Sequence, residues 1–285
     1  MSKAIKVLGL AYFFSDNEAY AKKGSSILKT WFIHPRTHMN PNLKYAQSVP
    51  GIEKSRRSGI LDGRDIPAMV LDSIIFFSNS KYWGNEENLV MDQWLRDYMI
   101  WLAYSPTGKD GATQENNHGT WYYYQVIAIA WYNKDMTLLK NTIPKVKELF
   151  ASQLDEEGGQ HKELKRTRSY FYSCFNLDAF TRIATISEKA GIPIWNYESS
   201  DGKNLRKAVD FLIPATKDET LWKYKTKKGV DTFYMALVLE RIRNKISNNE
   251  YTEVLKDIIA EMSATKQKGM RKRFLIEHHL LYEPI

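Results

Sequence analysis

Two short stretches of the chain combine side chains that can bind an anion with side chains that can transfer a proton. Residues 116–122 place two asparagines and a histidine directly before the apolar run 123–131. Residues 162–172 contain Arg166 and Arg168 together with two tyrosines. Amide and guanidinium groups donate hydrogen bonds to carboxylates, whereas an imidazole or a phenol can act as a general acid or base. The two stretches together predict an anion-binding site that also transfers a proton.

Each stretch also has a purely structural explanation. An asparagine of 116–117 can cap a helix, with His118 solvated beside it. Arg166 and Arg168 can neutralise the acidic residues within 155–163, and such a surface charge pattern contributes little to stability. Neither stretch is decisive alone, so the functional interpretation depends on the two acting together.

No motif for a metal or an organic cofactor stands out. Cys174 is the single cysteine, which excludes an internal disulfide and a multi-cysteine zinc site. His34 and His38 are four residues apart, but Pro35 argues against a helix through both, so we expect loop histidines. There is no phosphate-binding glycine loop, dinucleotide fingerprint or serine elbow. We expect neither a metal nor a cofactor.

The charge balance favours a polyanionic partner. The 285 residues include 41 basic and 33 acidic side chains, a net charge of +8. Nucleic acid, an anionic membrane surface and an acidic polysaccharide all fit that charge, and 13% aromatic residues suit stacking on bases or sugar rings. The basic run 266–273 could contact nucleic acid, although such runs are more often solvated surface. No apolar run reaches the roughly 18 to 20 residues that span a bilayer, so we expect no membrane span.

The apolar residues recur with the helical period nearly everywhere, which predicts an all-α chain. Short turns between paired segments indicate antiparallel helical hairpins, arranged as a toroid or a stacked array. Three long connections, 34–65, 105–119 and 151–169, are expected to wall a groove. The predicted helices are 5–14, 17–32, 66–77, 86–103, 120–131, 136–150, 170–190, 204–213, 231–245, 251–262 and 270–281.

Several ordered motifs resemble a known family, the helical polysaccharide lyases of the alginate lyase type. Asn117-His118-Gly119-Thr120-Trp121 is similar to the family's Asn-His-x-x-Trp element. Glu163-Leu164-Lys165-Arg166, followed closely by Tyr172, is similar to its Glu-Leu-x-Arg segment and catalytic tyrosine. The resemblance extends over residues 6–224, because upstream and downstream stretches also agree: 30–32, 39–47, 59–62, 201–208 and 222–224.

The resemblance implies an incomplete (α/α) toroid of antiparallel hairpins, formed as a single domain over 1–285 with further helices in 231–281. Family members usually carry an additional N-terminal portion and a secretion signal. The chain is expected to lack part of that portion. Residues 6–14 match a scaffold helix and not a signal peptide, although the resemblance implies a periplasmic or secreted protein.

The implied activity is cleavage of a 1,4-linked polyuronate by β-elimination, with alginate as the first choice of substrate and glucuronan or a similar polymer as the second. The implied catalytic residues are Asn117, His118, Arg166 and Tyr172. Asn117 and Arg166 would neutralise the substrate carboxylate, with Arg168 as the alternative cation. Tyr172 would act as base, acid or both, because a nearby guanidinium stabilises a phenolate. His118 would serve as the base or neutralise charge.

An acidic polysaccharide is therefore the expected partner, and nucleic acid is not. A non-catalytic uronan-binding protein remains the alternative function, a nucleic-acid binder is a third, and the oligomeric state stays open. Trp121 is expected to have a structural role in the site rather than a catalytic one. The expected substrate-binding residues are Asn42, Tyr45, Gln47, Arg57, Arg168, Trp121 and Tyr122.

Overall fold

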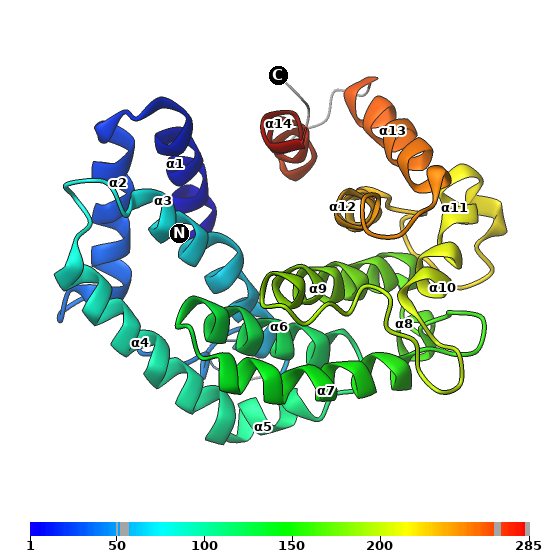
Figure 1. Cartoon of the computed structure of the whole chain (residues 1–285), viewed down its shortest axis with the longest axis horizontal. Helices are drawn as coiled ribbons and strands as arrows, with labels where there is room; N and C mark the ends of the chain where they lie inside the picture. The colour runs from blue at the N-terminus through cyan, green and yellow to red at the C-terminus, as the bar shows by residue number, and fades with distance from the viewer. Residues whose placement is uncertain (50, 52–56, 265–268, 283–285) are drawn as a thin grey trace. The chain divides into compact units, whose positions relative to one another are not determined.

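The computed structural model describes residues 1–49, 51, 57–264 and 269–282, and every regular element within these ranges is a helix (Figure 1). Within the same ranges, β-type hydrogen bonding between segments is limited to isolated bridges. The chain divides into two compact units. Unit 1 comprises residues 1–114 and 121–144, and unit 2 comprises residues 115–120 and 145–285. The expectation of one domain over the whole chain stays a prediction.

Unit 1 is built from paired helices. The left-handed conformation of Asp16 ends α1, and the side chain of Asn17 caps α2, so the chain reverses within two residues. Helix α1 packs against both α2 and α3 (Figure 1). The elements are α1 (Ser2–Ser15), α2 (Glu18–Leu28), the π-helix η1 (Lys29–Ile33), the 3-10 helix η2 (Arg57–Arg64), the π-helix η3 (Ile66–Leu71), α3 (Asp72–Phe77), α4 (Asn85–Tyr104), α5 (Pro106–Ala112), most of α6 (Asn117–Tyr132) and the first half of α7 (Met136–Gln153).

Aromatic residues of α4 fill the core of unit 1. Trp94 stacks on Tyr98, with ring centroids 5.4 Å apart, and meets Phe32 edge to face at 4.9 Å. Trp94 and Tyr98 are four residues apart and so lie on one face of the helix. Burying such rings supplies much of the hydrophobic stabilisation of a helical unit.

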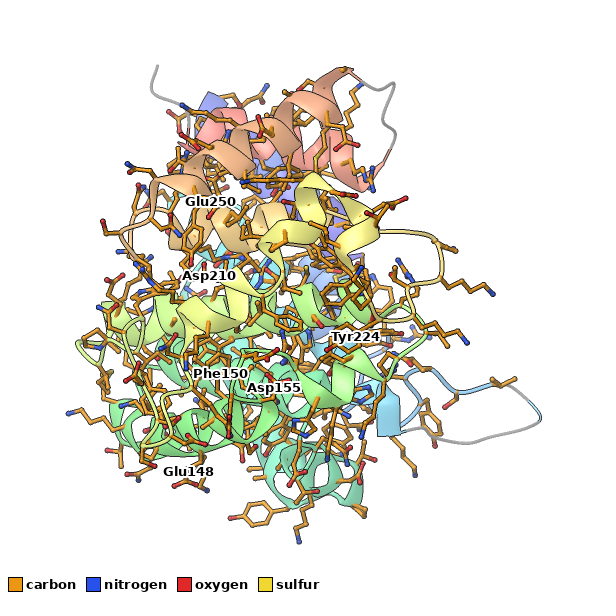
Figure 2. The ribbon with its side chains drawn as sticks, turned by 90° about the vertical axis from the view of Figure 1, so that its right-hand side faces the viewer. Glu148, Phe150, Asp155, Asp210, Tyr224 and Glu250 are labelled. Atoms are coloured by element: carbon orange, nitrogen blue, oxygen red, sulfur yellow. The ribbon has the colours of Figure 1, made fainter. Side chains whose placement is uncertain are left out.

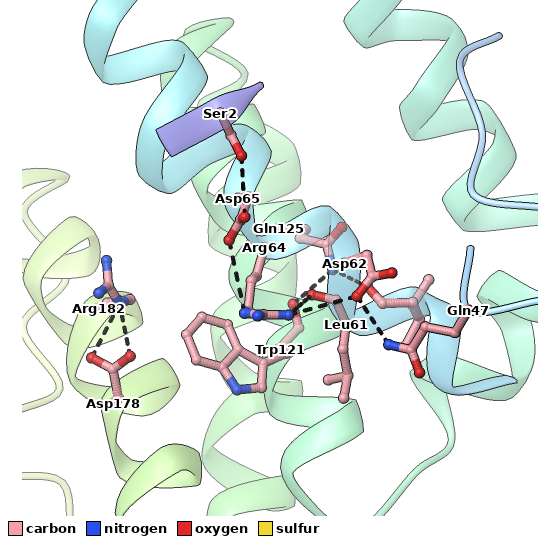
Figure 3. A network of polar contacts seen from close by, with 11 residues as sticks. Ser2, Gln47, Leu61, Asp62, Arg64, Asp65, Trp121, Gln125, Asp178 and Arg182 are labelled. Carbon is pink, nitrogen blue, oxygen red and sulfur yellow. Dashed lines mark hydrogen bonds and ion pairs between the residues drawn. The ribbon is translucent and has the colours of Figure 1, made fainter. Parts of the chain in front are cut away.

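One buried amide, that of Gln125, connects three segments of unit 1, and Figure 3 shows it beside η2. Gln125 of α6 donates to the carbonyl oxygen of Ile60 in η2 at 2.9 Å and accepts from the Tyr98 hydroxyl at 2.6 Å. Gly63 lies so close to Gln125 and Tyr98 that any Cβ there would overlap them. Residues 59–63 are thereby held against α4 and α6.

Unit 2 is centred on α9. Helix α8 precedes it, and α12 packs against both α9 and α13 (Figure 1). Phe180 of α9 stacks on Phe150 of α7 with centroids 3.8 Å apart. Asp210 of α10, labelled in Figure 2, accepts a hydrogen bond from Tyr251 of α13 at 2.7 Å. The elements are α8 (His161–Leu164), α9 (Ser169–Lys189), α10 (Leu205–Asp210), α11 (Ile213–Lys217), the 3-10 helix η4 (Glu219–Leu221), α12 (Phe233–Ile242), α13 (Asn249–Ala264) and α14 (Met270–Tyr282).

A buried ion triad fixes α12 on α9. Asp178 accepts from Arg182 at 3.2 Å and from Arg241 of α12 at 2.7 Å. Burial by itself would raise the pKa of Asp178, but the two guanidiniums outweigh it and hold that pKa below its ordinary value. Asp178 is thus ionised and paired inside the unit.

The helices agree with the sequence prediction, and the connections do not. Each long connection expected to be irregular contains a helix: η2 in 34–65, α5 in 105–119 and α8 in 151–169. Helix α6 begins at Asn117, three residues earlier than expected. The predicted helix 204–213 ends at Asp210, and a new helix starts at Ile213 with Pro214 in its first turn. Short helices of four to eight residues lack the repeated apolar spacing on which the prediction relied.

Two further expectations concern a membrane span and the basic run 266–273. No helix within the described residues is long and apolar enough to cross a membrane. The basic run 266–273 lies partly outside the described residues, which resume at Gly269.

Candidate active site

Asn117 and Glu163 form the buried centre of the site in unit 2. The backbone N–H and the side-chain Nδ2 of Asn117 both donate to Glu163 Oε1, at 2.7 and 2.8 Å. Asn117 is 0% exposed and Glu163 1% exposed. The first N–H groups of a helix have no partner within the helix, and its N-terminus favours negative charge. The α8 carboxylate therefore completes the start of α6 and fixes the orientation of the Asn117 amide.

Glu163 also faces the cation of the site. Its second oxygen, Oε2, lies 4.0 Å from Nη1 of Arg166. Burial raises the pKa of Glu163, while the Asn117 hydrogen bonds and the Arg166 charge oppose that rise without cancelling it. One carboxylate thus contacts the amide and approaches the guanidinium expected to bind the substrate.

Arg166 stacks on the ring of Tyr172. The guanidinium carbon lies 3.9 Å from the ring centroid, the geometry of a cation–π contact. A guanidinium that packs on a ring keeps in-plane N–H groups that can bind a carboxylate. Both side chains are partly exposed, so a ligand can reach them.

His118 follows Asn117 in the first turn of α6. Its backbone N–H donates to Asn116 Oδ1 at 2.9 Å, so Asn116 is the N-cap residue of the helix. The explanation that an asparagine of residues 116–117 only caps a helix is therefore correct for Asn116. It does not account for Asn117, whose amide is committed to Glu163.

A network of buried amides, which the sequence analysis missed, connects α6 to α9. Gln153 donates to Thr120 Oγ1 at 3.0 Å and to the Asn116 carbonyl oxygen at 3.2 Å. Asn176 donates to Gln153 at 2.7 Å and to Gln160 at 2.8 Å. Asn176 lies one helical turn after Tyr172 in α9. The network therefore fixes the start of α6 relative to the turn of α9 that carries Tyr172. Isolated Gln and Asn residues carry no sequence signal of such a network.

Arg168 is committed elsewhere. Its guanidinium carbon lies 4.0 Å from the Phe171 ring centroid, and Nη2 lies 3.8 Å from Asp231. Asp231 also binds Arg271 at 3.0 Å. This geometry favours Arg166 over Arg168 as the cation that meets the substrate carboxylate.

The upstream residues expected to bind substrate belong to unit 1. Asn42 accepts from the Lys44 backbone N–H at 3.1 Å, which forms a local turn. Gln47 donates to Asp62 at 2.9 Å (Figure 3). Tyr45 is 64% exposed. The side chain of Arg57 lies outside the described residues. A role for these four in binding stays a prediction.

Trp121 and Tyr122, also expected to bind substrate, are buried. Trp121 is 2% exposed and Tyr122 is 7% exposed. The Tyr122 hydroxyl donates to the Leu102 carbonyl oxygen at 3.3 Å, and burial raises the pKa of Tyr122 to about 12. Neither ring presents a face on which a sugar could stack, because the helical period of α6 turns both toward protein. The structure supports a packing role for them.

Within the ranges that the structure describes, no group of three or more His, Cys, Asp or Glu side chains is placed to hold a metal ion.

Comparison with known proteins relates the chain to one family. The family model described as alginate lyase matches residues 1–222. The chain is similar to an alginate lyase from Bacteroides ovatus, with 30% identity over 99% of this chain and 73% of that chain and a TM-score of 0.86. Alginate lyase A1-III from Sphingomonas species A1 is 18% identical over 88% of this chain and 69% of that chain, with a TM-score of 0.65. A histidine-to-alanine variant of A1-III complexed with tetrasaccharide is 17% identical over 87% and 68%, with a TM-score of 0.63.

The two Sphingomonas structures show a shared fold alone, and together with the Bacteroides structure they confirm the fold class expected from the sequence. No curated protein matches the chain.

Proposed function

Because the chain belongs to the alginate lyase family, we propose that Asn117, Arg166 and Tyr172 of unit 2 carry out its polysaccharide lyase reaction, the cleavage of alginate by β-elimination. The observation that carries the proposal is the continuous chain of contacts in unit 2. It runs from the Asn117 amide through Glu163 to Arg166, and from Arg166 onto the Tyr172 ring.

The reaction removes the proton from C5 of a uronate and breaks the bond between C4 and the glycosidic oxygen. The electron pair of the C–H bond becomes the C4–C5 double bond, and the departing oxygen takes up a proton. The products are a 4,5-unsaturated sugar and a new chain end. The carboxylate next to C5 resists additional negative charge, so it must be neutralised before the proton leaves.

Arg166 and Asn117 are suited to that neutralisation. The in-plane N–H groups of a guanidinium match the two oxygens of a carboxylate. The amide of Asn117 is oriented by Glu163 but is 0% exposed in this structure, so its contact with the carboxylate requires a displacement of the side chains that cover it. Preorganised donors of this kind stabilise a transition state by about 3 to 4 kcal/mol each.

Tyr172 and His118 supply the proton transfers. In a syn elimination the C5 proton and the leaving oxygen lie on one side of the sugar ring, and Tyr172 serves first as base and then as acid. In an anti elimination His118 takes the proton and Tyr172 protonates the leaving oxygen from the other side. Alginate is the first substrate, and glucuronan or a similar polyuronate is the second. Complexes of the Sphingomonas enzyme with tetrasaccharide support an oligosaccharide as the bound ligand.

The variant Tyr172→Phe tests the assignment. It keeps the ring under Arg166 and removes the hydroxyl, so kcat for alginate should fall about 10²- to 10⁴-fold, as measured by the ultraviolet absorbance of unsaturated product. The matched control is Tyr170→Phe, because Tyr170 is two residues away and fully buried. The control should keep kcat within a few-fold. Undiminished activity of Tyr172→Phe would disprove the role, and a wild-type protein without product from any polyuronate would disprove the function.

A further inference from the structure

A short segment of unit 2, residues 222–229, carries four lysines and no acidic residue. We call it the basic segment. All four lysines are exposed, and none of them forms an ion pair with a carboxylate of the residues that the structure describes. They are Lys223, Lys225, Lys227 and Lys228.

The basic segment is paired with the backbone that carries the site. Thr226 forms an isolated antiparallel bridge with Arg168. The Lys227 N–H donates to the Thr167 carbonyl oxygen at 2.7 Å, and the Ser169 N–H donates to the Lys225 carbonyl oxygen at 3.2 Å. Paired strands lie about 4.8 Å apart. The backbone of Lys225 and Lys227 is therefore about one strand spacing from the residues that join Arg166 to α9.

The rest of the basic segment is anchored firmly. Trp222 is buried and donates from Nε1 to Ser169 Oγ at 2.8 Å. Lys228 and Gly229 both have positive φ, which turns the chain, and Thr226 Oγ1 donates to the Gly229 carbonyl oxygen at 3.0 Å. The lysine side chains thus extend from a fixed backbone.

The acidic residues that flank the basic segment are already engaged. Asp231 binds two arginines, and Glu219 accepts from the Val230 N–H at 3.4 Å. Asp218 accepts from the backbone and hydroxyl of Thr220. Lys223 donates from Nζ to the Thr220 carbonyl oxygen at 3.3 Å, and the Thr220 hydrogen bonds together with the Lys223 charge lower the pKa of Asp218. The charges of Lys225, Lys227 and Lys228 therefore remain available for an external anion, and Lys223 must leave its carbonyl contact to join them.

We propose that the basic segment is an accessory subsite that binds carboxylates of the polyuronate chain beyond the sugar held at Arg166. This inference rests on the proposed function of the site. A 1,4-linked uronate polymer carries one carboxylate on every sugar, so a row of flexible ammonium groups can meet successive charges without exact register. Tyr224, labelled in Figure 2 on this segment, is 39% exposed and offers a ring face to a sugar between those charges.

The basic segment contains none of the residues proposed for the chemistry at Arg166 and Tyr172. An accessory subsite there would adjust how strongly long chains are held without altering that chemistry.

The test measures binding in the full-length Tyr172→Phe protein, so that turnover does not interfere. All four lysines of the basic segment are changed to glutamine, and titrations with polymannuronate and with a mannuronate trisaccharide give two dissociation constants. An exposed ion pair contributes up to about fivefold in affinity. The polymer should therefore bind about tenfold to hundredfold more weakly, with a reduced dependence on salt, whereas the trisaccharide should change by less than about twofold.

A matched control separates the basic segment from net charge. It changes four other exposed lysines of the chain to glutamine and lowers the net charge equally, from +8 to +4. We expect less than about twofold weaker binding of the polymer by this control. The control lysines are Lys140, Lys145, Lys189 and Lys256.

Three results would overturn the proposal. Equal losses in the two quadruple variants would assign the effect to net charge, and equal losses for polymer and trisaccharide would assign it to the catalytic site. Tighter binding of single-stranded RNA than of polymannuronate, lost in the basic-segment variant, would identify a nucleic-acid surface. Failure of the proposed function looks different, because it is an absence of unsaturated product from the wild-type protein whatever the lysines bind.

Discussion

Replacing Glu163 by glutamine tests how the site is held together. Glu163→Gln keeps an acceptor oxygen for both Asn117 donors but removes the negative charge that lies 4.0 Å from Arg166. Glu163→Ala removes the acceptor as well. The two variants therefore separate the hydrogen bonds from the charge.

The structure gives the expected size of each effect. A hydrogen bond to a charged group contributes about 1.5–3 kcal/mol, so Glu163→Ala should lower the free energy of unfolding by about 3–5 kcal/mol. Glu163→Gln retains two weaker, neutral bonds but also escapes the cost of burying the charge, so its free energy of unfolding at neutral pH should stay within about 1 kcal/mol of wild type. In the glutamine variant the substrate carboxylate no longer meets a buried negative charge, while Arg166 loses the charge that orients it. KM should therefore fall about two- to fivefold, and kcat should fall about tenfold or more.

The pH dependence has a definite sign. Burial raises the pKa of Glu163 above its ordinary value of 4.5, so the folded protein binds this proton more tightly than the unfolded chain. The ionised carboxylate therefore costs stability above the raised pKa, and that cost disappears as pH falls through the raised pKa toward 4.5. Relative to Glu163→Gln, the wild-type protein should gain stability between neutral pH and about pH 4.

Two measurements check this reasoning. Steady-state kinetics on alginate, followed by product absorbance, give kcat and KM, and urea unfolding at neutral pH and near pH 4 gives the stability difference. A merely structural role would lower the stability of both variants and leave kcat and KM of the folded glutamine variant unchanged. That result, or a stability difference that grows in favour of glutamine as pH falls, would refute the positioning role of Glu163.

Three other predictions concern stability and reactivity. Asp178→Asn leaves two arginines without their shared carboxylate, so it should lower the free energy of unfolding by about 3–5 kcal/mol at neutral pH. The loss should become smaller as pH falls through the depressed pKa of Asp178, and denaturant titrations at several pH values would show this. Gly63→Ala places a Cβ against the Gln125 side chain and the Tyr98 hydroxyl and should lower Tm by several degrees, as a thermal unfolding scan would show. Cys174 is buried and burial raises the pKa of its thiol, so a thiol reagent should react only as fast as the protein unfolds.

The sequence alone determined the helical class and the chemical composition of the site. Helical periodicity is a local property of the chain, so α4, α7, α9 and α12 could be predicted from apolar spacing. The motifs around Asn117, Arg166 and Tyr172 are also local, and their resemblance to one family identified the activity before any contact was known.

Only the tertiary structure shows which of those residues lie in contact. Glu163 and Asn117 are 46 residues apart, and no pattern within either stretch indicates that one carboxylate accepts both hydrogen bonds. The choice of Arg166 over Arg168 depends on which aromatic ring each guanidinium covers and on Asp231, a residue far along the chain.

The same limit explains the two aromatic residues of α6. Trp121 and Tyr122 have the residue types of a sugar platform, but burial depends on which neighbours cover a helix face, and that follows from the packing of distant segments. The sequence therefore determined which chemistry is available, because side-chain types and helical spacing are local. The tertiary structure decided which groups are oriented, paired or covered, because those properties arise from contacts between segments far apart in the chain.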